Sequence, residues 1–375
     1  MKKKLLCGLL AGILIFLPGC SGKKTLEKFS NTSISIGFNT SITLIGYCTS
    51  ETEFDKYFEE LSTDFTYYNQ LFDRYNTYDG VNNIKTINDN AGISPVKVDS
   101  AIIEMLKMAK EYYDLSNGAF DITIGKVLEI WHTYREAGIT ANSEGDENPA
   151  VPTQAELEAA RIDNGWDYVV IDEENSTVYL SDQRVSLDVG GIAKGYTSEL
   201  VAQKLIEDGL TQGAINGGGN VRLIGNKPDG SKWSIGVTEP DNTSLNAGTF
   251  YADKPYSFVT SGDYQRYYTS GGKVYSHIMD PDTLQPANKY RSVTIVAEYS
   301  GIADCLSTAL FVMDQAEGQK LIDDYNSSHT DQIGAYWIYD ADKKPSDLDV
   351  KEVDGYWVYA SENIQSMLDI YGATK

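Results

Sequence analysis

Near the middle of this 375-residue chain stands the segment Leu187-Asp188-Val189-Gly190-Gly191-Ile192-Ala193-Lys194-Gly195-Tyr196. Its apolar start predicts a strand over 185–189, and the residues from Ile192 to Asp208 predict a helix that ends at Gly209. Paired glycines let the backbone approach a ligand closely, and the free N–H groups at a helix start favour an anion such as phosphate. The segment therefore predicts a phosphate site between a strand and a helix. A purely structural turn is the alternative, because Gly-Gly pairs are common in turns.

Segments with helical and strand patterns alternate along the rest of the chain. Apolar spacings of three and four predict helices over 54–75, 100–117 and 303–313, and a capping box at 153–156 predicts a short helix. Strands are expected in a hairpin over 33–48 and at 168–172, 177–180, 185–189, 233–237, 258–260 and 292–297. The acidic segment 136–152 has no periodicity and is expected to be a surface loop. No repeat or linker divides the chain, so we expect an α/β (α+β) fold, a single mixed domain over 32–370 with a largely antiparallel sheet.

The composition excludes several classes of protein. The chain carries 31 Lys and Arg against 54 Asp and Glu, which gives a formal net charge of −23. Nucleic-acid affinity comes mainly from cationic side chains that displace counterions at phosphates, so no nucleic-acid partner is expected. Hydrophobic residues make up 41% of the chain, which excludes a disordered or fibrous protein and allows a large core.

The N-terminus has the pattern of an export signal. Met1-Lys2-Lys3-Lys4 is positively charged, residues 5–17 are an apolar run, and the run ends at Leu17-Pro18-Gly19-Cys20. This pattern is similar to a bacterial lipoprotein signal, in which cleavage precedes a cysteine that receives acyl chains. Because the run is shorter than the ~20 residues that span a bilayer, a plain secretory signal or a short anchor is the weaker alternative. We expect a signal peptide over 1–19, a lipidated tether over 20–31 and a location on the outer face of the bacterial cytoplasmic membrane.

Two cysteines, Cys48 and Cys305, lie outside this signal and tether. They allow one disulfide, but two cysteines do not make a disulfide framework. The sequence leaves open whether they pair.

Two further motifs follow strand-like runs. Asn216-Gly217-Gly218-Gly219-Asn220 places three glycines in succession, which indicates either close approach of a ligand or a tight β-bulge. Farther along, His277 and Asp280 flank a turn. They are candidates for a general base and for a carboxylate that orients it or binds a metal, although a lone histidine is usually structural.

A last motif opens the helix expected over 303–313. Asp304, Ser307 and Thr308 are spaced so that their oxygens share one helical face. Hard oxygen ligands on one face suit Mg²⁺. The alternative is that Asp304 only caps the N-terminus of its own helix.

Taken together and in this order, these motifs resemble the ApbE family, the FAD:protein FMN transferases. The resemblance includes Ser116-Asn117-Gly118-Ala119-Phe120-Asp121 and Trp131, and it extends over roughly residues 34–320. It implies a single α/β domain related to the T-fold. It also implies a transferase that cleaves the FAD pyrophosphate with Mg²⁺, joins FMN through a phosphoester bond to a Thr or Ser hydroxyl, and releases AMP. The acceptors in that family are exported flavoproteins such as Nqr and Rnf subunits and FMN-binding domains.

The resemblance assigns roles to individual residues of this chain. It implies Mg²⁺ ligands at the Ala193 carbonyl, Asp304, Ser307 and Thr308. It implies FAD contacts from Phe38, Tyr75, Ala119, Phe120, Asp121, Gly190, Tyr196 and Ile278. Lys194 would help to neutralise the pyrophosphate, and either His277, close to the scissile phosphate, or Asp280 would be the base. Phe38 stands where the family often has Met, and Cys305 stands where it usually has Ala.

Two other functions would use the same site. With water as the acceptor, the protein would be a Mg²⁺-dependent FAD pyrophosphatase that releases FMN and AMP. Without turnover, it would be a lipid-anchored flavin-binding protein, but such a protein has no need of a divalent ion beside the pyrophosphate.

Overall fold

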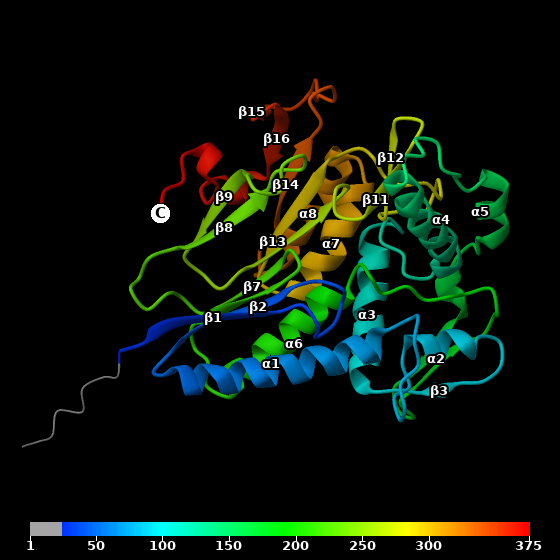
Figure 1. Ribbon diagram of the computed structural model, residues 1–375, viewed down its shortest axis with the longest axis horizontal. Coiled ribbons are helices and arrows are strands. Elements are labelled where there is room, and N and C mark those ends of the chain that lie inside the picture. Colours follow the sequence, from blue (N-terminus) through cyan, green and yellow to red (C-terminus); the bar gives the residue numbers. More distant parts are fainter. Residues whose placement is uncertain (1–24) are drawn as a thin grey trace, which may run out of the picture.

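A nine-stranded sheet forms the centre of the computed structural model, which describes residues 25–375 (Figure 1). All neighbouring strands in this sheet run antiparallel, as the sequence predicts. In spatial order the strands are β1 (Glu27–Ser33), β2 (Ile42–Cys48), β6 (Gly213–Gly217), β7 (Asn220–Ile224), β10 (Ser257–Gly262), β13 (Ser292–Ala297), β14 (Gly334–Tyr339), β16 (Tyr356–Ala360) and β15 (Lys351–Val353). The expected signal peptide and Cys20 lie outside the described residues.

The two faces of the sheet bury different partners because side chains alternate along each strand. In β6, Ala214 belongs to one apolar cluster and Ile215 to another. The Ile215 face is covered by four helices, α1 (Glu51–Phe72), α6 (Ala193–Glu207), α7 (Ser300–Val312) and α8 (Gln315–Ser328). The Ala214 face is covered by the hairpin of β8 (Trp233–Thr238) and β9 (Asn246–Ala252), followed near the C-terminus by α9 (Glu362–Gln365).

The remaining elements form a lobe beside the sheet, to the right in Figure 1. Its helices are α2 (Ile84–Asp89), α3 (Ser100–Leu115), α4 (Gly125–Ser143) and α5 (Gln154–Ala160). Its strands are β3 (Val96–Lys97), β5 (Thr177–Leu180) and β4 (Val169–Asp172), in that spatial order, and a hairpin of β11 (Tyr267–Ser270) and β12 (Lys273–Ser276) contacts α4. One apolar cluster runs from this lobe into α7 and β13, so lobe and sheet share a core.

Three local expectations differ from the structure. The segment 136–152 is not a loop throughout, because α4 continues to Ser143. Residues 185–189 form no strand of a sheet: Leu187 N–H donates to the Asn88 side chain and Asp188 N–H to the Ile122 carbonyl, so the partners of this extended segment are scattered. Strand β1 begins at Glu27, inside the stretch expected as a tether, because all seven of its residues pair with β2.

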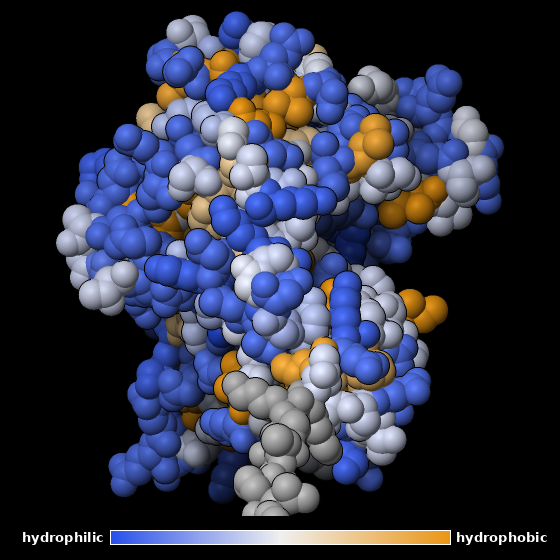
Figure 2. Space-filling model, turned by 90° about the vertical axis from the view of Figure 1, so that its left-hand side faces the viewer, coloured by the Kyte–Doolittle hydropathy of each residue, from blue (hydrophilic) through white to orange (hydrophobic). Residues whose placement is uncertain are grey.

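Two further observations bear on the surface and the thiols. Cys48 in β2 and Cys305 in α7 are both buried and free, so they form no disulfide in this structure. Figure 2 shows a face on which hydrophilic side chains predominate and hydrophobic ones lie in small separate groups. Among residues 25–375, no helix has the length and apolar character needed to cross a membrane.

A buried ion pair fixes α6 against the sheet and against α7. Glu199 of α6 is 1% exposed, and its two carboxylate oxygens accept hydrogen bonds from Arg222 of β7 at 2.8 and 2.9 Å. The same carboxylate accepts the N–H of Ser300, the first residue of α7, at 2.8 Å. Removing its charge leaves a buried guanidinium without its partner.

We therefore expect Glu199→Gln to lower the free energy of unfolding by roughly 3–5 kcal/mol, measured by urea denaturation. The control is Asp114→Asn, which breaks the exposed pair between Asp114 and Lys110 on α3 and should cost at most about 1 kcal/mol. Equal losses in the two variants would contradict the importance of the buried pair.

Candidate active site

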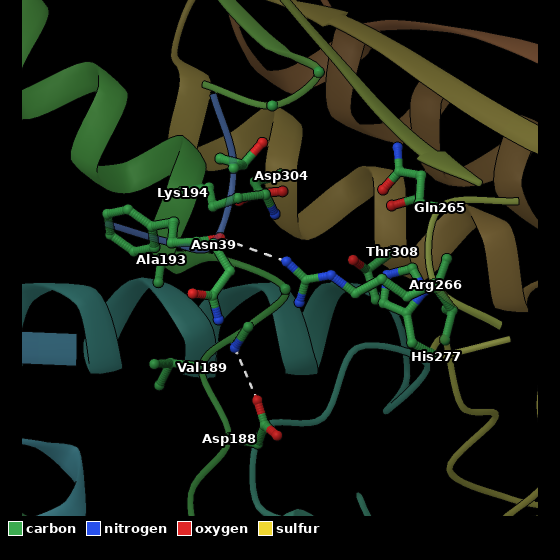
Figure 3. Close-up of a pocket in the computed structure, with 18 of the residues that line it drawn as sticks. Asn39, Asp188, Val189, Ala193, Lys194, Gln265, Arg266, His277, Asp304 and Thr308 are labelled. Carbon is green, nitrogen blue, oxygen red and sulfur yellow. Dashed lines mark hydrogen bonds between the residues drawn. The ribbon is translucent and has the colours of Figure 1, made fainter. Parts of the chain in front are cut away.

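A cavity of about 910 Å³ lies where the lobe meets the sheet, within the usual ~300–1,000 Å³ of ligand pockets. Its walls come from segments far apart in the chain: the loop after β1, the residues after α1, one face of α4, the start of α6, and parts of β8, β10 and α7. Figure 3 shows side chains from several of these segments converging on it. The glycine segment identified in the sequence, 188–194, forms one of these walls.

The glycines of that segment are required by close packing. Asp188 Oδ1 accepts the N–H of Gly190 at 2.9 Å, which turns the chain toward α6 (Figure 3). A Cβ on Gly191 would lie 3.0 Å from the Phe120 ring and 3.1 Å from Thr308 Oγ1. The backbone can therefore approach α7 and the lobe together only without a side chain at this position.

Asp304 joins the start of α6 to α7. Asp304 is only 3% exposed, and its Oδ2 accepts a hydrogen bond from the Gly195 N–H at 2.7 Å. Helix α7 begins at Ser300 with Tyr299 as its N-cap, so Asp304 does not cap its own helix. The carboxylate instead satisfies a free N–H in the first turn of a neighbouring helix, whose positive end it faces.

Three of the four expected metal ligands meet at the cavity. Ala193, Asp304 and Thr308 line it, and Asp304 Oδ1 has no hydrogen-bond partner in residues 25–375. Ser307 lies behind them: it is fully buried, its hydroxyl donates to the Asp304 carbonyl, and it contacts the Ser261 hydroxyl at 2.8 Å.

This donor set fits Mg²⁺. Mg²⁺ is usually held by one or two carboxylates, with water and substrate phosphates as its other ligands. The described residues contain no group of three or more His, Cys, Asp or Glu side chains arranged to hold a metal, as a transition-metal site would have. A single buried carboxylate with one free oxygen, beside a carbonyl and a hydroxyl, is suited to an ion that arrives with a phosphorylated ligand.

His277 lies partly buried at the cavity wall, just after β12. Burial, followed by the charges of Arg266, Arg135 and Lys194, lowers its pKa from 6.5 to about 3. The imidazole is therefore neutral at pH 7, and its Nδ1 has no hydrogen-bond partner within the described chain. In Figure 3 His277 lies next to Arg266 and Thr308.

Asp280 and Tyr196 do not line the cavity. Asp280 Oδ1 accepts the N–H groups of Asp282 at 2.9 Å and Thr283 at 3.3 Å, so this carboxylate stabilises a turn. Tyr196 is 4% exposed and packs in the core against Phe72, with ring centroids 6.0 Å apart. Of the two candidate bases, the structure brings only His277 to the cavity.

The other expected FAD-contact residues and Lys194 all line the cavity, namely Phe38, Tyr75, Ala119, Phe120, Asp121, Gly190, Lys194 and Ile278. Phe120 is 2% exposed, whereas Tyr75 is 52% exposed and stands at the rim. Burial raises the pKa of Asp121, whose carboxylate accepts the N–H and the hydroxyl of Thr123 at 2.8 and 2.7 Å.

The triple glycine also reaches the cavity. Gly218 and Gly219, with φ of +62° and +98°, form the tight turn between β6 and β7 and line the wall. A Cβ on Gly218 would meet Thr40 Oγ1 at 2.1 Å. The sequence left ligand approach and a β-bulge open, and the structure shows a hairpin turn at the ligand cavity.

Several cavity-lining residues on α4 and in other segments carried no prediction from the sequence, namely Arg74, Leu128, His132, Arg135 and Arg266. Those on α4, together with Trp131, follow the spacing 128, 131, 132, 135, which is one face of a helix. That periodicity was the signal available in the sequence, but no helix was predicted over these residues.

An α/β domain whose cavity combines a buried carboxylate, a helix start and several cations has the groups needed to bind a phosphorylated ligand with a divalent ion. A family model described as the ApbE family matches residues 33–334. The FAD:protein FMN transferase of Vibrio cholerae serotype O1 is 29% identical over 312 residues, 81% of this chain and 86% of that protein. The one of Treponema pallidum is 26% identical over 332 residues, 85% of this chain and 88% of that protein.

The solved structures agree. The crystal structure of the ApbE protein from Thermotoga maritima has a TM-score of 0.74 and 29% identity, and it covers 91% of this chain and 99% of that chain. This chain belongs to the ApbE family.

The low pKa of His277 has a consequence for stability. An unfolded histidine takes up a proton below its ordinary pKa of 6.5, whereas native His277 stays neutral down to about pH 3. The unfolded state therefore binds more protons in this window, and falling pH destabilises the native state by about 1.4 kcal/mol per unit.

We expect His277→Gln to remove about 2 kcal/mol of the stability lost between pH 7 and pH 5, measured by urea denaturation at both values. The exposed His329, replaced by Gln, is the matched control and should leave that loss unchanged. An identical loss in the wild type and His277→Gln would show that His277 is not held neutral by burial.

Proposed function

We propose that this protein is a FAD:protein FMN transferase. It transfers the FMN moiety of FAD to a Thr or Ser hydroxyl of an exported flavoprotein, such as an Nqr or Rnf subunit or an FMN-binding domain, and releases AMP. The observation that carries the proposal is the buried Asp304 carboxylate, with one oxygen bound to the start of α6 and the other free at the cavity, among residues that match the family.

The reaction exchanges one phosphoester for another. The acceptor hydroxyl oxygen forms a bond to the phosphorus of the FMN half, the bond from that phosphorus to the bridging oxygen breaks, and AMP leaves with that oxygen. The hydroxyl proton passes to a base. The chain must therefore hold the pyrophosphate, neutralise its charge and accept a proton.

Asp304, the Ala193 carbonyl and the Thr308 hydroxyl would hold Mg²⁺, with Ser307 as a supporting residue behind them. The bound ion supplies neutralisation of charge on the pyrophosphate oxygens. The Lys194 ammonium, at the start of α6 on the cavity wall, favours the same anion. The glycines let the backbone come close enough for this contact.

His277 is suited to accept the proton. It is neutral, its Nδ1 is unpaired within the described residues, and it lies at the cavity wall. The cations that lower its pKa would be neutralised by a bound pyrophosphate, and its basicity would then rise. Asp280 is less suited because its carboxylate is engaged in a turn outside the cavity.

The proposal includes the compartment. The basic start, the apolar run and Cys20 support export and lipidation of the mature N-terminus, which would hold the enzyme on the outer face of the bacterial cytoplasmic membrane. Acceptors exported to the same face would be within its reach. Two or more acyl chains on Cys20 suffice for a stable anchor.

The direct test is to incubate residues 21–375 with FAD, Mg²⁺ and an exported FMN-binding domain, and to measure the intact mass of that domain. We expect a gain equal to one FMN, which disappears when Mg²⁺ is removed by a chelator. Release of AMP and FMN without labelling would instead indicate the pyrophosphatase. Neither labelling nor AMP would leave a flavin-binding protein.

A second test concerns Asp304. We expect Asp304→Asn to lower the transfer rate by roughly a hundredfold or more, because the amide keeps an oxygen for the Gly195 N–H but loses the charge that attracts the ion. The control is Asp182→Asn, which removes a surface carboxylate paired with Arg184. A near-normal rate in Asp304→Asn, with an unchanged Mg²⁺ requirement, would exclude Asp304 as a ligand.

A further inference from the structure

Arg135 is a nearly buried cation whose one ion pair in the described residues is long and exposed. Its side chain is 12% exposed, and the nearest carboxylate oxygen, on the exposed Glu136, is 3.6 Å away. Its Nη2 donates to Nδ1 of His132 at 2.7 Å, while its buried Nε has no partner in the described residues. Burial lowers the pKa of Arg135, because removing water from the guanidinium at the cavity wall disfavours its charged form.

Arg266 is the second such cation. It precedes β11 and is exposed at the cavity, where its Nη2 donates only to the Phe38 carbonyl at 3.4 Å. Within residues 25–375 it makes no ion pair. In Figure 3 its guanidinium extends from the side of His277 toward Asn39, across the cavity.

The two guanidinium groups act on the same space. Both charges lower the pKa of His277, and both also act to lower the pKa of Tyr75, against the effect of its burial. Asp188, which also lines the cavity, is already paired with Arg74 at 2.5 Å. Among residues 25–375, the only carboxylate within 4.0 Å of either guanidinium belongs to the exposed Glu136, at 3.6 Å from Arg135.

Two guanidinium groups that line one cavity, and whose one ion pair is long and exposed, are suited to a phosphate, which each can bind with two N–H groups. A pyrophosphate has two phosphates. Resting on the proposed function, in which the residues around Asp304 would hold Mg²⁺ against the pyrophosphate, we propose that Arg135 and Arg266 bind the phosphate that departs on AMP. Cleavage adds negative charge to that phosphate, so its two cations stabilise the leaving group.

His132 positions Arg135 in this arrangement. An arginine can only donate hydrogen bonds, so His132 Nδ1 is the acceptor and its proton is on Nε2. The tilted Tyr75 ring lies 5.1 Å from the His132 ring and closes the outer side. Arg135 is therefore the fixed half of the site, and the exposed Arg266 is the half that can move onto a ligand.

The test compares the affinities of AMP and adenosine, measured by calorimetry on residues 21–375 in the presence of a chelator. The difference between these two ligands is the phosphate alone. We expect the wild type to bind AMP at least about tenfold more tightly than adenosine. Arg135→Gln and Arg266→Gln should each weaken AMP binding by about tenfold and leave adenosine within about twofold.

Arg184→Gln is the matched control, since Arg184 is a surface arginine outside the cavity, and it should bind both ligands as the wild type does. Arg266 is exposed, so its variant tests the proposal even where Arg135→Gln is destabilised. The proposal is overturned if the wild type does not prefer AMP, or if Arg266→Gln keeps the full preference.

This result is separable from the proposed function. Labelling of an acceptor by the wild type, combined with an unchanged AMP preference in both variants, would overturn the phosphate site and leave the transferase intact. Absence of labelling would overturn the transferase, while the comparison of AMP with adenosine would still decide whether the two arginines bind a phosphate.

Discussion

The hydrogen bond from Gly195 N–H to Asp304 Oδ2 holds the site together. It joins the first turn of α6 to α7, and those two helices carry every expected metal ligand. The contact is close because Gly195 has no side chain: a Cβ there would lie 2.4 Å from the Ser300 carbonyl and 2.5 Å from Asp304 Cβ. The buried pair of Glu199 with Arg222 secures the same helices one turn farther along. The positions of the cavity oxygens therefore follow from helix packing rather than from loop conformation.

The charge distribution is the second constraint. The chain as a whole is strongly acidic, yet its cavity gathers Lys194, Arg135 and Arg266 around a neutral histidine. Such a cluster is costly in the free protein, because like charges repel and burial removes water from Arg135. A bound anion would relieve that cost, so under the proposed function part of the affinity for a pyrophosphate would come from this repulsion.

The sequence predicted the parts of the fold whose signals are local. Helices α1, α6 and α7 follow apolar spacings, and β13 was placed at 292–297 as it occurs. The glycine segment and Asp304 were recognised because their motifs are short and contiguous. What the sequence could not give was tertiary: that Asp304 caps α6 rather than its own helix, and that Tyr196 and Ser307 turn away from the cavity.

Helix α4 shows why some of the site was missed. The segment 136–152 is acidic and has no periodicity, so it was expected to be a loop, although α4 continues to Ser143. Arg135, just before that expected loop, received no role, because an arginine is ordinarily a solvated surface charge. Only the spatial meeting of α4 with residue 266, 131 positions later, shows that these cations face one ligand space.

The histidine and the arginines form one coupled system. The same cations that depress the pKa of His277 are those available to bind an anion. In the free protein His277 is a poor base, so it does not take up a proton and add a further positive charge to the cluster. In the proposed reaction, a bound pyrophosphate would neutralise the cations, so the field at the imidazole would fall and its basicity would rise. Proton acceptance by His277 would thereby be favoured when the ligand is present, which would couple the binding of the nucleotide to the readiness of the base.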